Sequence, residues 1–285
     1  MHKICYDLFM KLNKFIPDKL FMILNYSIRF KRIPNIISPK RFTEKIQLRM
    51  INDEMFKYTD FVDKYKVREF IEGAIGKEYL TNLIGVYNKV EEINFDKLPD
   101  KFVLKTNHGS GYFIICSDKK QLNIDDCKNK LSKWMKENYY NKCKEKQYKN
   151  IERKIICEEF IGNLNSDFLD CRVFCFNGKP EFIQIDEGFA YGQTRRNHYD
   201  LNWNKLDFKM KYDSIEREIK KPKNLAKVIE LAEVLCRDFN FVRVDFYLSD
   251  EKIYFSELTF TPTGGRQVIK PDKYDFILGE KLMNI

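Results

Sequence analysis

The sequence has few of the residues that build zinc or disulfide sites. It contains three histidines and eight cysteines in 285 residues, and no two cysteines form a C-x-x-C pair. A histidine-based zinc site is therefore not expected. The cysteines stand mostly within apolar strand or helix patterns, and we interpret them as reduced, small hydrophobic residues of a cytoplasmic protein.

Long hydrophobic runs are also absent. The apolar stretch at residues 20–24 is short and is followed by Arg29, Lys31 and Arg32, so we expect neither a signal peptide nor a membrane-spanning helix. The basic, aromatic segment 2–32 leaves two alternatives open. Packing against the body of the protein is favoured, and peripheral contact with an anionic membrane surface is the other. We therefore expect a cytoplasmic location, with the inner face of the membrane as the alternative.

The familiar glycine motifs for phosphate are missing as well. An apolar run ends at Lys105, the segment Asn107-His108-Gly109-Ser110-Gly111 follows, and a second apolar run begins at once. This order predicts strand, loop, strand. A P-loop and a dinucleotide fingerprint both require a helix directly after the glycines, so both are excluded. An ordinary hairpin turn and a loop whose N–H groups cover phosphates remain as alternatives.

Apolar residues make up 44% of the chain, aromatic residues 15% and charged residues 33%, which indicates a folded and soluble protein. Lys and Arg number 51 and Asp and Glu 42, which gives a net charge of +9. This excess favours anionic partners. The chain has no dense Lys/Arg run, so nucleic acid is not the expected partner.

Residues 238–265 form the most informative stretch. Two apolar strands flank a polar turn predicted at residues 250–252, a register that places Asp245 opposite Glu257 and Arg243 opposite Thr259. Facing carboxylates repel each other, and burial raises the cost, so the pair favours a bound cation such as Mg²⁺. A slipped register, or two solvated acids at a sheet edge, is the alternative.

Other segments add cations and turns. A helix predicted over residues 60–73, capped by Thr59, places Lys64 and Arg68 on one face. The Asn177-Gly178 pair predicts a tight hairpin between two apolar runs. The polar segment 193–203, QTRRNHYDLNW, is predicted to be a surface loop in which Arg195 and Arg196 form a candidate anion clamp.

Several motifs, in this order, resemble the ATP-grasp superfamily and within it the TupA-like branch, which is associated with teichuronopeptide and capsular polysaccharide biosynthesis. They are FTEKIQ at 42–47, DKYKVREF at 63–70, LPDKFVLKTNHGSG at 98–111, CEEF at 157–160, CFNGKPEFI at 175–183, RNHYDLNW at 196–203, and FVRVDFY with YFSELTF at 241–260. The resemblance implies an α+β fold in which two α+β subdomains clamp ATP. The expected parts are a helical N-terminal region at 1–78, a subdomain with the glycine-rich loop at 79–157, and a C-terminal subdomain with the metal-binding hairpin at 158–285.

The resemblance also implies ATP and Mg²⁺ as cofactors and a site assembled from many segments. Superfamily members commonly have Asn two residues after the metal-binding Glu, where this chain has Thr259; a hydroxyl can also ligate magnesium. The implied residues are Lys64, Lys105, Gly109, Ser110 and Gly111 for the phosphates, Glu158, Glu159, Phe160 and Ile161 for adenine, Asp167 or Asp170 for the ribose, Asp245, Glu257 and Thr259 for magnesium, and Arg243, Arg196 and Lys105 for catalysis. For His108 two alternatives stay open, a contact to substrate or phosphate and an exposed loop residue without a contact.

The function implied is an ATP- and Mg²⁺-dependent carboxylate–amine ligase that forms an amide through an acyl phosphate. The expected substrates are a hexuronic acid, free or in nucleotide- or lipid-linked form, and an amino acid or small amine in cell-surface polysaccharide assembly. Two alternatives stay open. One is a glycosyltransferase of the same pathway that uses a nucleotide-sugar, and the other is a non-enzymatic basic scaffold that binds anionic polymer or membrane.

Overall fold

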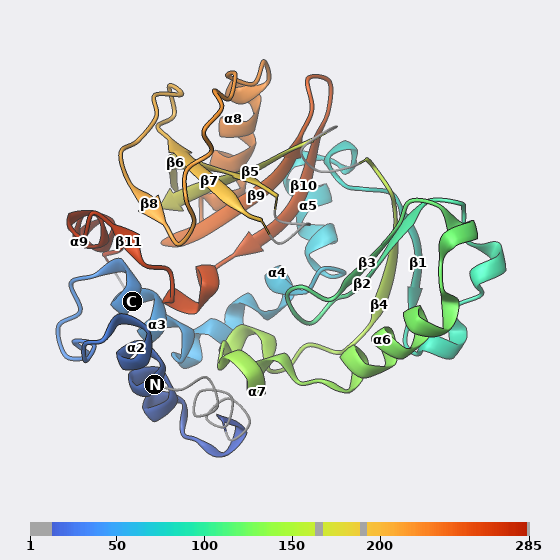
Figure 1. Ribbon diagram of the computed structural model, residues 1–285, viewed down its shortest axis with the longest axis horizontal. Coiled ribbons are helices and arrows are strands. Elements are labelled where there is room, and N and C mark those ends of the chain that lie inside the picture. Colours follow the sequence, from blue (N-terminus) through green and yellow to red (C-terminus); the bar gives the residue numbers. More distant parts are fainter. Residues whose placement is uncertain (1–12, 163–167, 189–192, 284–285) are drawn as a thin grey trace.

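The framework of the molecule consists of two antiparallel sheets, one of four strands and one of five. The structure is a computed structural model that describes residues 13–162, 168–188 and 193–283. Figure 1 shows the four-stranded sheet at the right, the five-stranded sheet above the centre, and the N-terminal helices α2 and α3 below the latter. The predicted α+β class with an N-terminal helical region is confirmed.

The four-stranded sheet has the order β1-β4-β2-β3 and is covered on one face by helix α6. Side chains alternate along its central strand, so Phe102 and Leu104 pack in the core with Leu131 of the helix, while Lys105 faces the other way. The glycine-rich segment 107–111 joins β2 to β3, as predicted. The elements are β1 (Leu83–Tyr87), β2 (Phe102–Thr106), β3 (Phe113–Cys116), α6 (Ile124–Lys136), α7 (Tyr139–Cys143) and β4 (Ile155–Glu159).

The five-stranded sheet has the order β10-β9-β5-β6-β7 and two very different faces. One face is apolar, where Val173, Ile183 and Val244 pack with Val228 and Leu235 of helix α8. The other face carries the charged residues of the site. The predicted hairpin at Asn177-Gly178 is confirmed, with both residues at positive φ. The elements are β5 (Leu169–Phe176), β6 (Lys179–Glu187), β7 (Arg195–Tyr199), α8 (Leu225–Cys236), β9 (Phe241–Leu248) and β10 (Ile253–Thr259).

The hairpin of β9 and β10 has the predicted register. Asp245 pairs with Glu257 and Arg243 with Thr259. The turn is one residue longer than predicted, because Leu248 already pairs with Ile253. The pairing shifts between Phe255 and Glu257, where Ser256 forms a bulge, and this shift compensates for the longer turn.

The helical N-terminal region differs from the prediction in one place. The expected single helix over residues 60–73 is divided into α4 (Thr59–Val62) and α5 (Val67–Ile75). The Asp63 carboxylate accepts hydrogen bonds from the backbone N–H groups of Tyr65 and Lys66, a local pattern that competes with the helix. Lys64 therefore lies in a turn and not on a helical face. The preceding helices are α2 (Asp18–Phe30) and α3 (Phe42–Met50).

Residues 193–203 also differ from the prediction. They were expected to form a surface loop, but residues 195–199 are strand β7 at the edge of the five-stranded sheet. Arg196, Asn197 and His198 are buried. The remaining elements of the described chain are β8 (Lys209–Met210), β11 (Ile269–Lys270) and α9 (Lys273–Lys281).

The cysteines from 116 onward are free and buried, which agrees with their interpretation as reduced core residues. Among the described residues, no helix has the length and apolar character needed to cross a membrane.

Gly279 generates a stability prediction, because helices α9 and α3 meet there with no space for a side chain. A Cβ atom at this position would lie 2.1 Å from the Lys40 carbonyl oxygen and 2.8 Å from the Phe42 nitrogen. Because both are backbone atoms, relief requires the helices to separate. We expect Gly279→Ala to lower the free energy of unfolding by about 2 kcal/mol, measured by urea denaturation.

Gly73 provides the control. It lies within α5, and a Cβ atom there would meet nothing within 4 Å. Gly73→Ala should raise the free energy of unfolding by roughly 0.5–1 kcal/mol, since alanine is the better helix former. Equal effects of the two substitutions would contradict the close packing of α9 on α3.

Candidate active site

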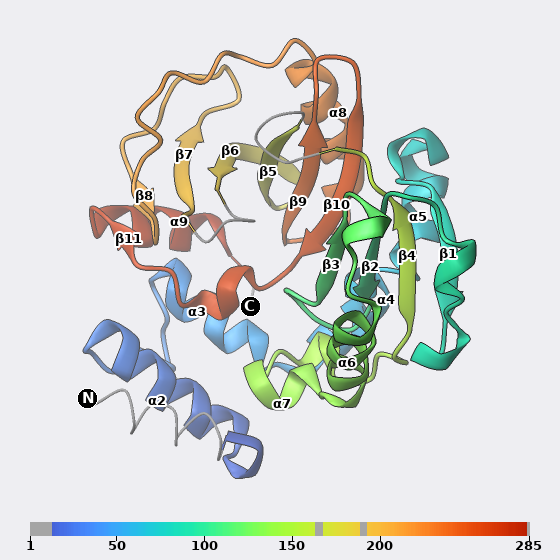
Figure 2. The same ribbon diagram turned by 45° about the vertical axis from the view of Figure 1, so that its right-hand side comes forward.

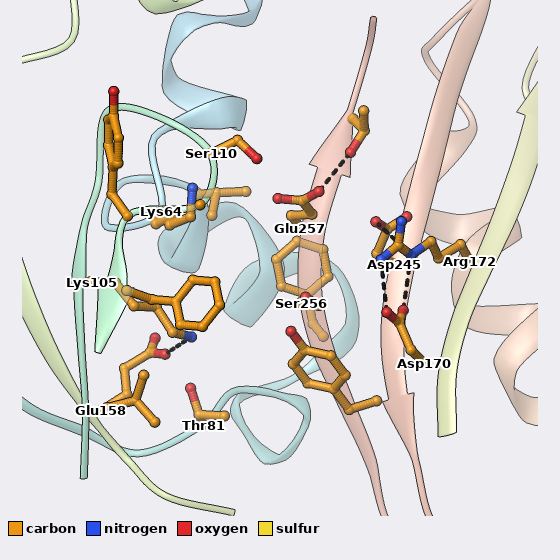
Figure 3. Close-up of a pocket in the computed structure, with 18 of the residues that line it drawn as sticks. Lys64, Thr81, Lys105, Ser110, Glu158, Asp170, Arg172, Asp245, Ser256 and Glu257 are labelled. Carbon is orange, nitrogen blue, oxygen red and sulfur yellow. Dashed lines mark hydrogen bonds and ion pairs between the residues drawn. The ribbon is translucent and has the colours of Figure 1, made fainter. Parts of the chain in front are cut away.

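A cavity of about 400 Å³ lies between the two sheets. Its walls come from the four-stranded sheet, the glycine-rich loop, the charged face of the five-stranded sheet and the segment that follows β10. In Figure 2, β9 and β10 are the strands of their sheet nearest the other sheet. Figure 3 shows Lys64, Lys105 and Glu158 on one side of this space and Glu257, Asp245 and Arg172 on the other.

One row of polar side chains crosses all five strands of the larger sheet. Because the strands are paired in register, residues at matching positions point to the same face. The row runs through His198, Gln184, Arg172, Asp245 and Glu257. The hairpin acids are therefore the end of a continuous polar row.

Arg172 is the centre of an ion-pair network on this face. It makes two hydrogen bonds to Asp170, at 2.9 and 2.7 Å, and its Nη1 lies 3.1 Å from Asp186. Its Nε is also 3.8 Å from Asp245. The carboxylates of Asp170 and Asp186 raise the pKa of Arg172 although burial opposes this shift. The guanidinium thus stays charged and connects β5 with β6 and β9.

Arg196, which was predicted to be a loop cation, is part of the same network. Its Nε and Nη2 each donate to Asp186 at 2.6 Å, and Nη1 donates to the Met210 carbonyl at 3.2 Å. Its side chain is 3% exposed. The guanidinium borders the cavity, but its donors are bound by protein groups. The prediction that this segment is a loop is therefore wrong, whereas an anion-binding role of Arg196 stays a prediction.

In the hairpin, a cation does lie between the two facing acids, and it is Arg243. Its Nε and Nη2 donate to Asp245 at 2.7 and 2.5 Å, and Nη2 also lies 3.3 Å from Glu257 and 3.1 Å from the Thr259 hydroxyl. Burial raises the pKa of Asp245 to about 7. The charges of Lys64 and Arg243 lower the pKa of Glu257 although burial opposes them.

The hairpin residues fit a hard divalent cation with one condition. Asp245, Glu257 and Thr259 offer oxygen atoms from neighbouring strands, the donors that Mg²⁺ prefers. No group of three or more His, Cys, Asp or Glu side chains suited to a metal exists in the described chain, so phosphate or water must supply further ligands. The condition is that Arg243 releases Asp245, since it binds both carboxylate oxygens.

The opposite wall carries the cations that were predicted for phosphate. Lys105 Nζ donates to Glu158 at 2.6 Å, and Arg68 Nη1 donates to the other oxygen of the same carboxylate at 2.9 Å. Lys64 Nζ donates to the Gly109 carbonyl at 2.5 Å. Burial lowers the pKa of Lys64, whereas the charge of Glu158 raises the pKa of Lys105 against the effect of burial.

The residues of the glycine-rich loop differ in whether they reach the cavity. Ser110 and Gly111 line the cavity, and the Gly109 carbonyl accepts from Lys64. His108 is turned away: its ring is buried against α6, with Nε2 3.1 Å from the Trp134 carbonyl oxygen. Burial lowers its pKa to about 4, so the ring is neutral near pH 7. The expectation that His108 contacts phosphate does not agree with this placement.

The segment after β4 borders the cavity where adenine was expected. Glu159, Phe160 and Ile161 line it, and the Glu159 carboxylate accepts from the Asn82 N–H at 2.9 Å. Glu158 is instead bound between Lys105 and Arg68. Asp170, expected at the ribose, lines the cavity but pairs with Arg172, and Asp167 lies outside the described residues.

Several residues at the cavity were not predicted from the sequence, among them Arg172, Glu145 and Arg266. For Arg172 a signal existed. In the apolar run LDCRVFCF, Asp170 and Arg172 are two residues apart, so alternation places them on one face of the strand. Glu145 stands in a lysine-rich stretch, and nothing in that local pattern indicates its burial.

One family of known proteins matches most of the chain. The family model described as TupA-like ATPgrasp matches residues 44–283, whereas no curated protein sequence matches the chain.

Solved structures of similar fold include D-alanine–D-alanine ligase from Bacillus anthracis complexed with ATP, at 18% identity and a TM-score of 0.45, covering 73% of this chain and 57% of that one. An L-amino acid ligase from Bacillus licheniformis is 10% identical with a TM-score of 0.46 and coverages of 88% and 55%. The ATP-grasp ligase PsnB, complexed with a phosphomimetic variant of its minimal precursor, Mg and ADP, is 10% identical with a TM-score of 0.44 and coverages of 82% and 60%. The chain thus spans less than two thirds of the length of each of these structures.

The Glu158 carboxylate generates a prediction about stability and pH. Glu158→Gln leaves Lys105 and Arg68 without their shared counter-ion. Removing one partner of a buried ion pair costs about 3–5 kcal/mol, so we expect a loss of about 3 kcal/mol in the free energy of unfolding at neutral pH, measured by urea denaturation.

The pH dependence has a definite sign. Lys105 and Arg68 lower the folded-state pKa of Glu158 from its ordinary value of 4.5, although burial opposes them. Its stabilising contribution is therefore complete above 4.5 and is lost as the pH falls through the folded-state pKa. The difference between wild type and variant should shrink in that acidic range. Glu216→Gln, which breaks an exposed pair with Arg195, should leave the free energy of unfolding nearly unchanged at all pH values.

Proposed function

The chain belongs to the TupA-like ATP-grasp family, and on that premise we propose that it is an ATP- and Mg²⁺-dependent carboxylate–amine ligase. The observation that carries the proposal is the opposition of two walls across one cavity. Lys64 and Lys105 stand on one side, and Asp245 and Glu257 on the other. Phosphoryl transfer requires cations that neutralise the phosphates and acids that hold a metal ion on them. Here the two sets of side chains face each other across the cavity.

In this proposal the nucleotide lies along the four-stranded sheet. Lys64 and Lys105 bind its phosphates, and the N–H groups at Ser110 and Gly111 cover them. The segment Glu159, Phe160 and Ile161 borders the adenine. Asp245, Glu257 and Thr259 hold Mg²⁺, which supplies charge neutralisation on the phosphate oxygens. Arg243, freed from Asp245, is then available to the transferring phosphoryl group.

The chemistry follows from charge and positioning. A carboxylate oxygen of the acid substrate forms a bond to the γ-phosphorus of ATP, and the bond to the β-phosphate oxygen breaks, so ADP leaves. The neutral amine nitrogen then attacks the carbonyl carbon of the acyl phosphate, the bond from that carbon to the phosphate oxygen breaks, and the leaving phosphate takes up the proton that the nitrogen loses. Both steps bring anions or leaving phosphate past fixed cations, and neither needs a protein nucleophile. The buried cysteines therefore need no catalytic role.

The substrate class rests on the family alone. The acid would be a hexuronic acid, free or in nucleotide- or lipid-linked form, and the amine an amino acid or small amine, in cytoplasmic assembly of capsular or other cell-surface polysaccharide. The net charge of +9 is compatible with such acidic substrates.

Ligand-induced stabilisation tests the nucleotide and metal assignment. A non-hydrolysable ATP analogue with Mg²⁺ should raise the thermal midpoint of the wild type, since a ligand at about one hundred times its Kd contributes about 2.7 kcal/mol. Asp245→Asn and Glu257→Gln should remove the Mg²⁺-dependent part of this shift. Asp250→Asn alters an exposed acid in the turn of the same hairpin and should preserve it.

Turnover provides the second measurement. ADP release should require both a uronic acid and an amine, and it should fall at least a hundredfold in Asp245→Asn. Stabilisation by UDP-sugars in place of the ATP analogue would instead favour the glycosyltransferase alternative. Wild-type rates of ADP release in both Asp245→Asn and Glu257→Gln would contradict the proposal.

A further inference from the structure

Five residues of the cavity wall have no part in the nucleotide assignment: Glu145, Tyr148, Thr261, Arg266 and Lys211. Thr261 donates to Glu145, the charge of Glu145 acts on Tyr148, and the charge of Arg266 acts on Glu145. The Lys211 N–H donates to the carbonyl of Val268, two residues after Arg266, and we refer to this group as one end of the cavity. We infer that this end binds the amine substrate as an α-amino acid, with its ammonium group on Glu145 and its carboxylate on Arg266 and Lys211. The inference rests on the proposed ligase function and specifies which amine the site accepts.

Glu145 is a buried carboxylate with no cationic partner in the described chain. It is 6% exposed. Its Oε2 accepts from the Thr261 hydroxyl and from Gln147 Nε2, at 3.4 Å for the latter. The Cys143 side chain is a further hydrogen-bond partner of the carboxylate and lowers its pKa. None of these three partners carries a positive charge. Burial of a charge without a counter-ion is costly. The ammonium group of a ligand would supply the missing charge.

The lysines on either side of Glu145 do not supply it. Lys144 Nζ donates to the Ile16 carbonyl at 3.0 Å and lies 3.4 Å from Asp18. Lys146 pairs with Asp53 at 2.5 Å. Both side chains therefore bind the helical N-terminal region. Burial raises the pKa of Glu145 and the charge of Arg266 lowers it, which indicates that Arg266 is near but outside ion-pair distance.

Arg266 and Lys211 are the complementary cations. Arg266 Nε donates to the Thr263 carbonyl at 3.0 Å, and neither side chain lies within 4.0 Å of a carboxylate among the described residues. Both line the cavity. A planar guanidinium with free N–H groups matches a carboxylate in two-point contact. The separation between Glu145 and Arg266 is thus a gap that a zwitterion can bridge.

The Thr261–Arg266 segment holds both subsites in a fixed relation. Gly264 N–H donates to the Thr261 carbonyl at 2.8 Å, and Arg266 N–H donates to the Thr263 carbonyl at 3.2 Å. Gly265, at φ +65°, packs so closely on α3 that a Cβ atom would lie 2.7 Å from the Thr43 carbonyl oxygen. The turn is therefore fixed against α3, and its two ends present Thr261 beside Glu145 and the Arg266 guanidinium.

The location agrees with the chemistry of ligation. The turn directly follows β10, which carries Glu257 and Thr259, and the charge of Glu257 is close enough to raise the pKa of Glu145. An amine nitrogen at Glu145 would lie next to the end of the site where phosphate is transferred. It would meet the acyl phosphate there, whereas the amino acid carboxylate would be held apart on Arg266.

Ligand stabilisation on top of Mg·ADP tests the inference without knowledge of the acid substrate. The thermal midpoint of wild-type protein saturated with Mg·ADP is measured with each proteinogenic L-amino acid. Each amino acid is compared with two analogues, its decarboxylated amine and its N-acetylated form. At least one amino acid should raise the thermal midpoint further. Its decarboxylated and N-acetylated forms should bind about tenfold more weakly or not at all.

The variants separate the two subsites. Arg266→Met should weaken the amino acid at least tenfold and leave its decarboxylated amine unchanged, while Glu145→Gln should weaken both. An unaltered Mg·ADP shift in each variant shows that it is folded. Arg217→Met and Glu152→Gln alter exposed residues that do not line the cavity and serve as controls with unchanged binding.

The possible failures are distinguishable. Absence of any Mg·ADP shift in the wild type would overturn the proposed function itself. A normal Mg·ADP shift with no further effect of any amino acid would overturn only the inference. So would equal binding of an amino acid and its decarboxylated amine, or a preference for the amino acid that survives Arg266→Met.

Discussion

The structure depends on the burial of charge on one face of a sheet whose other face is apolar. Arg172 stands on the middle strand and contacts acids from its own strand and from both neighbouring strands. A register slip of one residue would move these charges onto the face that packs on α8. The ion pairs therefore set the register of the strands, and the register sets where Asp245 and Glu257 stand. The same groups that make the site polar also determine its geometry.

On the opposite wall of the cavity, the position of Lys64 depends on the break between helices α4 and α5. Asn107 donates to both oxygens of Asp63 at 2.9 Å, and the Lys64 N–H donates to the Asn107 carbonyl at 3.3 Å. The break in the helix is thus attached to the start of the glycine-rich loop. Through it, Lys64 reaches the loop that would cover a phosphate. The helical N-terminal region is in this way part of the site and not an appendage to it.

Local patterns predicted those features that depend on neighbouring residues. The Asn177-Gly178 turn and the pairing of Asp245 with Glu257 follow from turn chemistry and alternation, and the register at the acids is as predicted because the Ser256 bulge offsets the longer turn. Features created by distant partners were not predictable. The break at Asp63 combines local hydrogen bonds with contacts from the distant Asn107. Arg196 is buried by Asp186, and Arg172 gains its central role only when β5 pairs with β9.

Because Arg243 already binds the hairpin acids, a metal ion can enter the hairpin only by exchange with this arginine. Its guanidinium already neutralises Asp245 and reaches Glu257, so a divalent ion entering between the acids would have to displace a positive charge that belongs to the protein. Metal binding alone would then be a substitution with little net electrostatic gain. A nucleotide changes the balance, because its phosphates offer the displaced guanidinium a new partner. On the proposed function, metal and nucleotide would be taken up together, and free Mg²⁺ would compete poorly for a site that the chain keeps occupied with its own arginine.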